Sequence, residues 1–236
     1  MANQYFQFRR FTVCQDRTAM KVGTDGTLLG AWAEVGEGSG PILDLGTGTG
    51  LIALMMAQRF PDAQITGIDI DADAVGQARE NVAASPFSDR IQIFQADATA
   101  FALSAATPFS AIVCNPPFFV DALTCPDQQR TTARHAETLT YSQLMAAAWR
   151  LLADNGELSV VIPFDCKAKL ESEAALRGFF KSRECAVKTT PRKPARRFLL
   201  AFRKHPSAVE QTEGVIETSP GQRSAWYESL TRDFYL

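Results

Sequence analysis

The sequence predicts an α/β protein built on one mostly parallel β-sheet. Between residues 41 and 180, short runs rich in Val, Ile and Leu alternate with longer amphipathic segments. Strands that alternate with helices need crossover connections, which produce a parallel sheet with helices on both faces. The chain has 236 residues, of which 46% are hydrophobic, and this is enough for one well-buried domain with a small appendage.

The first forty residues precede this regular alternation. Residues 5–14 are aromatic and β-branched, which predicts an extended segment. Residues 28–33 predict a short helix, with Thr24 or Asp25 as its N-terminal cap. We therefore expect residues 1–40 to form a short N-terminal extension.

The main domain is expected to span residues 41–205, where the alternation is regular. Its strands are predicted at residues 41–45, 64–70, 91–97, 109–115 and 157–163. Its helices are predicted at residues 51–60, 72–84, 141–156 and 168–180.

Two further strands, at residues 184–190 and 196–204, are separated only by a turn at Pro191–Pro194. This spacing is too short for a helix, so the two strands should form an antiparallel pair at the sheet edge. The prediction is thus a seven-stranded, mostly parallel sheet with an antiparallel terminal strand. Residues 206–236 form a tail without an assignment, although five side chains in it fit one or two amphipathic turns: Trp226, Tyr227, Leu230, Phe234 and Tyr235.

Composition excludes several classes of protein. No apolar run reaches the roughly 18 residues that span a bilayer, and the N-terminus lacks the apolar core of a signal peptide. The five cysteines are scattered without a CxxC pair, and there are only two histidines. We therefore expect no membrane association, no metal and no disulfide framework, but a monomer in the reducing cytoplasm.

The charge is distributed unevenly along the chain. Residues 1–22 carry four basic side chains and one acidic, and residues 181–205 carry nine basic and one acidic. The body between them carries nine basic and nineteen acidic side chains. This asymmetry predicts that a polyanion binds at one face, against the alternative of a solvated surface with spare cations.

A glycine-rich loop follows the first strand of the main domain. Gly46, Gly48 and Gly50 lie between a strand and a helix, where glycine lets the backbone turn tightly and approach a ligand. Asp44 lies just before the loop in the strand. Such a loop at the carboxyl end of a parallel strand indicates a Rossmann-like nucleotide site.

Two more carboxylates occupy matching positions on the next two strands. Asp69 ends the second strand, where it can accept hydrogen bonds from both ribose hydroxyls. Asp97 ends the third strand and can face an adenine amine. The G-x-G-x-G spacing departs from the G-x-G-x-x-G of dinucleotide sites and resembles the first motif of class I methyltransferases. That resemblance implies S-adenosyl-L-methionine as the cofactor, with a dinucleotide oxidoreductase as the remote alternative.

The segment Asn115-Pro116-Pro117-Phe118 follows the fourth strand. It matches the [D/N]-P-P-[F/Y/W] motif of methyltransferases that act on amine nitrogens. The Asn115 side-chain oxygen and the Pro116 carbonyl can accept the two N–H groups of a planar amine, which favours its nucleophilic geometry. The prolines, Pro116 and Pro117, restrict the backbone, and Phe118 offers a face for stacking. A rigid turn alone is the alternative reading of two prolines.

The tetrapeptide leaves several acceptors open, namely adenine in DNA or RNA, guanine in ribosomal RNA and a protein glutamine. The basic ends of the chain favour nucleic acid, since cations pair with phosphates without reading sequence. The candidate RNA-binding residues are Arg9, Arg10, Arg17, Lys188, Arg192, Lys193, Arg196 and Arg197.

Residues 5–205 resemble the bacterial methyltransferases of valine transfer RNA. The resemblance is carried by residues 8–33, ILDLGTGTG, NPPFF and KPARRFLLAF, and most particularly by the K-V-G-T-D-G-x-L-L-G-A-W run at Lys21–Trp32. It implies N6-methylation of adenine 37, beside the anticodon. It also implies that the N-terminal extension covers the cofactor, with Lys21, Gly23 and Asp25 near it.

Residues 119–137 are long and loop-like beside the catalytic motif, so we expect a functional loop. Its His135 is a candidate catalytic residue, although a solvated loop histidine is the simpler interpretation. Two alternatives to the transfer-RNA enzyme stay open at this point. One is a methyltransferase of another amine, and the other is an RNA-binding protein with an inactive cofactor site.

Overall fold

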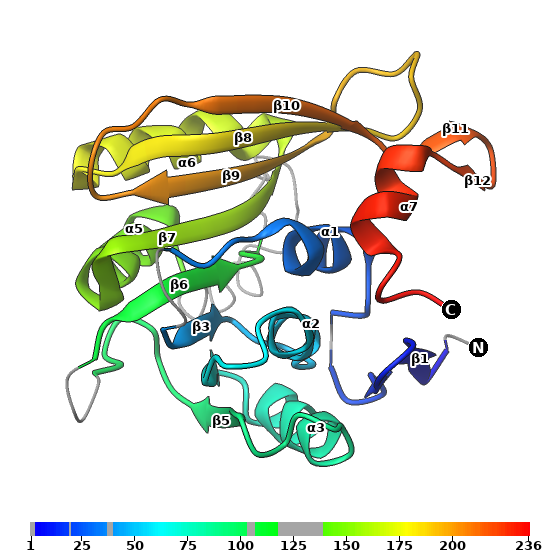
Figure 1. Ribbon diagram of the computed structural model, residues 1–236. Coiled ribbons are helices and arrows are strands. Elements are labelled where there is room, and N and C mark those ends of the chain that lie inside the picture. The colour runs from blue at the N-terminus through cyan, green and yellow to red at the C-terminus, as the bar shows by residue number, and fades with distance from the viewer. Residues whose placement is uncertain (1–2, 19, 37–39, 103–106, 118–138) are drawn as a thin grey trace, which may run out of the picture.

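The computed structural model describes residues 3–18, 20–36, 40–102, 107–117 and 139–236. Its centre is an eight-stranded sheet in the order β10-β8-β9-β7-β6-β3-β4-β5 (Figure 1). The strands are β3 (Ile42–Leu45), β4 (Ile65–Asp69), β5 (Ile91–Gln95), β6 (Phe109–Cys114), β7 (Leu152–Pro163), β8 (Phe180–Lys188), β9 (Arg197–Arg203) and β10 (Glu210–Val215). The α/β fold predicted from the sequence is confirmed.

The direction of the strands follows from their pairing. β5, β4, β3, β6 and β7 are parallel neighbours, and β9 lies antiparallel between β7 and β8. β8 therefore runs in the same direction as β7, and the β8–β9 turn lies at the carboxyl edge of the parallel strands. The expected antiparallel pair is present, but β10 of the tail pairs in parallel with β8 and adds an eighth strand outside it.

Helices cover both faces of this sheet (Figure 1). One hydrophobic cluster joins the sheet to α1 (Thr24–Trp32), α2 (Leu51–Arg59), α3 (Ala72–Ala83) and α7 (Ala225–Thr231). A second cluster, on the other face, joins it to α5 (Tyr141–Leu151) and α6 (Phe164–Arg177). The central strands β3 and β6 are buried on both sides, which explains their nearly continuous apolar sequences.

The helix predicted at residues 141–156 ends earlier, at Leu151. Leu152 has an extended backbone and pairs with Phe109 of β6, so the chain enters β7 at once. The backbone carbonyl of Leu152 also accepts a hydrogen bond of 2.7 Å from Lys204 Nζ. The sequence near Leu152 does not mark this change of conformation, because the pairing partner is remote in sequence.

Two helix starts also differ from the prediction. α6 begins at Phe164, directly after Pro163, four residues before the expected start. α1 begins at Thr24 with Gly23 as its N-cap, and no side chain caps it. Thr24 and Asp25 therefore lie inside the first turn and are not the caps that the sequence suggested, because Asp25 is engaged elsewhere.

The two ends of the chain lie close together (Figure 1). The N-terminal segment forms a hairpin of β1 (Tyr5–Gln7) and β2 (Thr12–Cys14). Its Phe8 stacks on Tyr235 of the tail, with ring centroids 5.8 Å apart. The tail continues as a second hairpin of β11 (Glu217–Ser219) and β12 (Gln222–Arg223) and ends after α7, which confirms the expected amphipathic turns.

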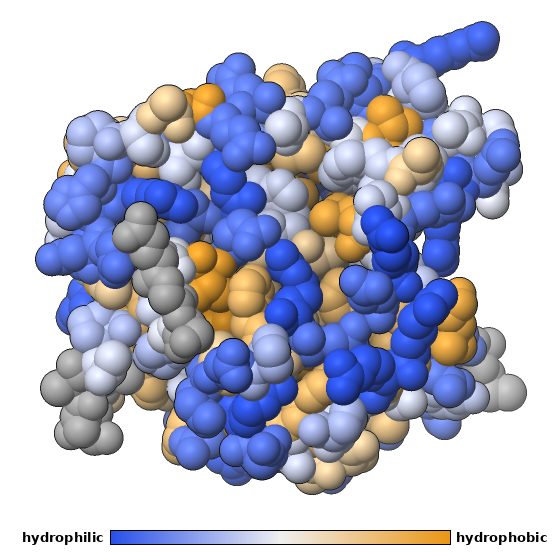
Figure 2. All heavy atoms as spheres, viewed as in Figure 1, coloured by the Kyte–Doolittle hydropathy of each residue, from blue (hydrophilic) through white to orange (hydrophobic). Residues whose placement is uncertain are grey.

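The surface seen from the same side is mostly hydrophilic, with apolar atoms in small patches (Figure 2). Long hydrophilic side chains protrude at the upper right, where Figure 1 shows the turn between β8 and β9. In the described part of the chain, no helix combines the length and hydropathy needed to cross a bilayer.

Candidate active site

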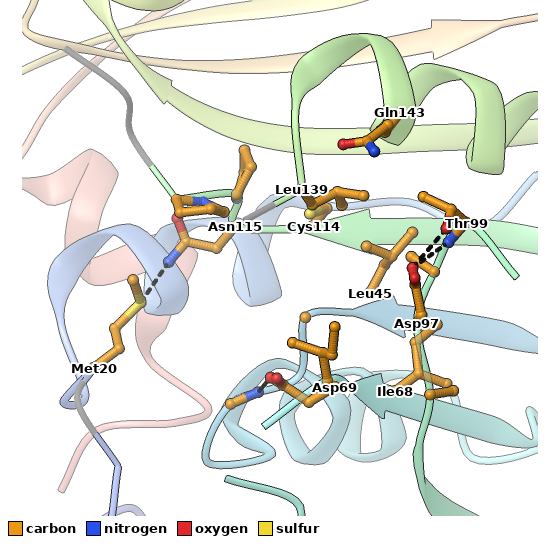
Figure 3. A pocket seen from close by; sticks show the side chains of 17 residues that line it. Met20, Leu45, Ile68, Asp69, Asp97, Thr99, Cys114, Asn115, Leu139 and Gln143 are labelled. Atoms are coloured by element: carbon orange, nitrogen blue, oxygen red, sulfur yellow. Dashed lines mark hydrogen bonds between the residues drawn. The ribbon is translucent and has the colours of Figure 1, made fainter. Parts of the chain in front are cut away.

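Two adjoining cavities lie at the carboxyl edge of the parallel strands. The first has a volume of about 280 Å³ and is lined by residues that follow β3, β4, β5 and β6 (Figure 3). The second has a volume of about 330 Å³ and lies between the glycine loop, the start of α1 and the start of β9. Their walls share Met20, Gly46, Gly48 and Asn115, so the two cavities meet beside Asn115.

The glycine loop has the conformation that only glycine adopts readily. Gly46, Gly48 and Gly50 have φ values of 75°, 55° and 81°. A Cβ atom at Gly46 or Gly48 would meet no heavy atom within 4 Å, so the space beside both residues is open. Packing does not explain the glycines there, and an open cradle beside the backbone is suited to a ligand.

Asp69 and Asp97 both line the first cavity, as the sequence predicted from their positions at strand ends. Asp69 Oδ2 accepts a hydrogen bond of 2.8 Å from the Gly48 backbone N–H, which ties the strand end to the glycine loop. Asp97 Oδ1 accepts bonds of 2.8 Å from both the backbone N–H and the hydroxyl of Thr99. Each carboxylate is held in place and still borders the cavity.

Asp44 differs from the other two carboxylates, because it is fully buried and lines neither cavity. Its Oδ2 accepts hydrogen bonds from the Thr47 hydroxyl at 2.7 Å and from Ala53 N–H at 3.0 Å. Its Oδ1 has no partner among the described residues. Burial raises the pKa of Asp44 to about 7, against the lowering effect of those two hydrogen bonds, and nearby Asp69 raises it further.

Asn115 follows the last residue of β6 and lies where the two cavities meet. Its Nδ2 donates to Met20 Sδ over 3.6 Å (Figure 3). Its Oδ1 is buried and has no partner within the described residues. Pro116 and Pro117 line the first cavity next to it. A buried oxygen without a donor is costly, so the site is prepared for an N–H group from a ligand. Phe118 and the loop at 119–137, with His135, lie outside the described residues.

Lys21, Gly23 and Asp25 line the second cavity, on the side of the N-terminal extension. Asp25 forms an ion pair with Arg197, the first residue of β9. Lys21 Nζ donates to the backbone carbonyl of Gln15. The three residues that the family resemblance associated with the cofactor are therefore brought together, and Arg197 joins them.

The eight predicted RNA-binding residues fall into two groups, those with a partner in the protein and those without one among the described residues. Five of them have protein partners. Arg9 donates to the Tyr235 carbonyl, and the Arg10 guanidinium lies 5.0 Å from the centre of the Phe87 ring. The other three form ion pairs with carboxylates: Arg17 with Glu80, Lys188 with Glu213 over 2.7 Å, and Arg197 with Asp25.

The other three, Arg192, Lys193 and Arg196, are exposed and have no side-chain partner among the described residues. They lie on the turn between β8 and β9, which we call the basic turn (residues 189–196). This turn is at the same edge of the sheet as the two cavities.

Sequence reasoning missed several residues of the first cavity. Met20 and Ile70 are about half exposed, and both border it. Leu139 and Gln143 reach it from the start of α5. Thr140 and Gln143 form a capping box, and their spacing in the sequence indicates only a helix start. No local signal marks Met20, because its contact with Asn115 spans 95 residues.

Among the described residues, no group of three or more His, Cys, Asp or Glu side chains could hold a metal ion. The two cavities together suit a nucleoside that carries a charged polar substituent. Carboxylates border the first cavity, an open glycine cradle lies between the two, and charged side chains of both signs border the second.

The chain is similar to known proteins in sequence and in fold. The family model described as "Methyltransferase small domain" matches residues 27–192. A tRNA1(Val) (adenine(37)-N6)-methyltransferase from Bacteroides thetaiotaomicron is 46% identical over all of this chain and 99% of its own length. The enzyme with the same name from Phocaeicola vulgatus is 48% identical, again over all of this chain and 99% of its own.

Solved structures agree on the fold. A predicted O-methyltransferase from Agrobacterium tumefaciens has a TM-score of 0.66 over 89% of this chain and 96% of its own, at 21% identity.

Proposed function

The chain belongs to the methyltransferase family that its full-length relatives represent, and on this premise we propose that it methylates N6 of adenine 37 in valine transfer RNA. The methyl donor in this proposal is S-adenosyl-L-methionine. The family resemblance read from the sequence is thereby confirmed.

The donor fits the two cavities as follows. Adenosine belongs in the first cavity, where Asp69 can accept from the ribose hydroxyls and Asp97 faces the base. The open backbone at Gly46 and Gly48 lets the ligand lie close to the loop. The sulfonium then lies beside Asn115, at the junction of the cavities. S-adenosyl-L-methionine supplies a methyl group that is already activated for transfer.

The observation that carries the proposal is the unpartnered, buried Oδ1 of Asn115 at this junction. Because Nδ2 is bound by Met20, the carboxamide is oriented with its oxygen free. The oxygen can accept one N–H of the adenine amine, and the Pro116 carbonyl can accept the other. These hydrogen bonds stabilise the positive charge that develops on the amine nitrogen during transfer. Stacking of the base on Phe118 stays a prediction.

The basic turn supports RNA over a protein glutamine as the acceptor. Arg192, Lys193 and Arg196 are exposed at the carboxyl edge of the sheet, where the cavities also lie, so they can bind phosphates while the target base enters the cavity. Adenine 37 must leave its stack to bring N6 to the sulfonium. We propose that the protein acts as a monomer on transfer RNA in the cytoplasm.

The test is methyl transfer from labelled S-adenosyl-L-methionine to a transfer-RNA pool from a strain without the enzyme. The expected product is labelled N6-methyladenosine at position 37 of the valine isoacceptor. Label on a guanine or on protein would identify another amine methyltransferase. RNA binding without any transfer would indicate a binding protein with an inactive cofactor site.

A further inference from the structure

Arg197 borders the second cavity, although its basic neighbours in the sequence lie on the surface. We propose that Arg197 binds the carboxylate of the donor's methionine group and does not contact RNA. This assignment rests on the proposed function and adds a donor-binding residue to it. Arg196 and Arg197 are adjacent and both basic, but this assignment gives them different ligands.

The position of the adenosine determines where the methionine group must lie. Asp69 and Asp97 border only the first cavity, whereas Asp25 and Arg197 border only the second. The sulfonium has to lie beside Asn115, which borders both. The methionine arm leaves the sulfur on the side away from the adenosine, so it extends into the second cavity.

The charges of the second cavity match this arm, which carries one ammonium and one carboxylate. Asp25 and Arg197 present opposite charges at neighbouring positions, and about a third or less of each side chain is exposed. Arg197 uses Nε to bind Asp25. Its two terminal nitrogens have no partner in the described parts of the chain, and they can hold a carboxylate through two parallel hydrogen bonds.

The backbone of α1 supports the same assignment. The helix follows Gly23 without a side-chain cap, so its first-turn N–H groups have no side-chain acceptor. The same turn, at residues 23–26, lines the second cavity. Asp25 holds Arg197 at the start of this helix, through an ion pair between residues 172 positions apart. The ion pair therefore positions the guanidinium where an anion has further donors around it.

Arg196 provides the comparison within the chain. It is exposed on the basic turn, and its backbone carbonyl accepts from Phe164 N–H over 3.0 Å. Successive side chains of an extended strand point to opposite sides, so Arg196 and Arg197 face different surroundings. One is placed for RNA phosphates, and the other for the donor.

The test compares two donors that differ only in the carboxylate, S-adenosyl-L-methionine and its decarboxylated form, by calorimetric titration. In Arg197→Gln, affinity for S-adenosyl-L-methionine should fall by about 30-fold, because a charge-assisted double hydrogen bond is lost. Affinity for the decarboxylated form should change less than about twofold. Arg197→Lys, which keeps the charge but not the fork, should give an intermediate loss.

Arg196→Gln is the matched control, with binding to an unmodified valine transfer-RNA transcript measured without donor. It should weaken RNA binding and leave both donor affinities unchanged, whereas Arg197→Gln should leave RNA binding unchanged. Equal loss of both donors in Arg197→Gln, or unchanged binding of both, would overturn the assignment alone. Failure of the wild-type protein to bind either donor would overturn the proposed function and the assignment with it.

Discussion

The two cavities and the basic turn lie at the same edge of the sheet, but they are built in opposite ways. In the cavities the polar groups are held by the protein itself, as Asp69 is by Gly48 and Asp97 by Thr99. On the basic turn, Arg192, Lys193 and Arg196 are exposed and without side-chain partners among the described residues.

The difference fits the two kinds of ligand that we propose, a small-molecule donor in the cavities and RNA at the basic turn. A small molecule gains affinity from groups that are already oriented, because less freedom is lost on binding. Lysine and arginine side chains bind a phosphate backbone by displacing the salt cations around it. The orientation of these side chains therefore matters less, and ionic strength matters more. Charge alone does not distinguish these two groups of cations, since five of the eight candidates have partners within the protein and three do not.

The largest effect is expected from removing the free oxygen between the cavities. Asn115→Ala should lower kcat for transfer RNA by about 1000-fold, because the acceptor for the reacting amine is lost. Donor affinity should change only a few-fold. Single-turnover methylation and a donor titration measure the two effects separately.

Asn115→Asp is the matched variant, since a carboxylate keeps the acceptor and occurs at this position of the motif. It should retain clearly more activity than Asn115→Ala. Equal loss in both variants, with donor binding intact, would mean that the side chain acts through Met20 and not on the amine.

A smaller effect is expected from neutralising the basic turn. Arg192→Gln, Lys193→Gln and Arg196→Gln together should weaken transfer-RNA binding by about 30-fold at physiological salt. The steepness of log affinity against log salt should fall by about 2. Each phosphate contact that is lost no longer releases counterions from the RNA when the protein binds. Donor affinity should stay the same, which filter binding and calorimetry would check.

Arg177→Gln serves as the control for this experiment. Arg177 is exposed at the end of α6, at the opposite edge of the sheet from the cavities. Its loss should leave RNA affinity and the salt slope unchanged. If it weakens binding as much as the basic turn does, the RNA is held by net charge and not by this edge.

A third effect, on stability and not on activity, concerns the protein without ligand. The pKa of Asp44 is raised to about 7 in the folded chain from 3.8, so the folded state retains a proton that the unfolded state releases. The free energy of unfolding should therefore fall with rising pH between about 4 and 7, by about 1.4 kcal/mol per pH unit from this group, and be constant above that range.

Asp44→Asn should remove this contribution, because asparagine does not titrate. Urea unfolding of both proteins at pH 5, 6, 8 and 9 would show this contribution as a difference in unfolding free energy that changes between pH 5 and 6 and stays nearly constant between pH 8 and 9. A pH-independent difference would mean that Asp44 is ionised throughout in the folded chain.

Most of the fold could be predicted, because its signals are local. Alternation of apolar runs and amphipathic segments located each helix and strand that the structure describes between Pro41 and Arg203, and the spacing of the last two strands predicted their antiparallel pairing. The end of α5 at Leu151 could not be predicted, since it depends on pairing with Phe109. The eighth strand was missed for the same reason, because β10 is polar and is recognised only through its partner β8.

The sequence by itself determined the glycine loop, the carboxylates at successive strand ends and the Asn-Pro-Pro segment, because parallel strands bring their carboxyl ends to one edge. Only the tertiary structure decided which side chains of the site contact each other and which polar atoms stay without a partner among the described residues. Arg197 pairs with Asp25 across 172 residues, and Asn115 contacts Met20 across 95. Such partners depend on how distant segments pack, and no local pattern of residues encodes that packing.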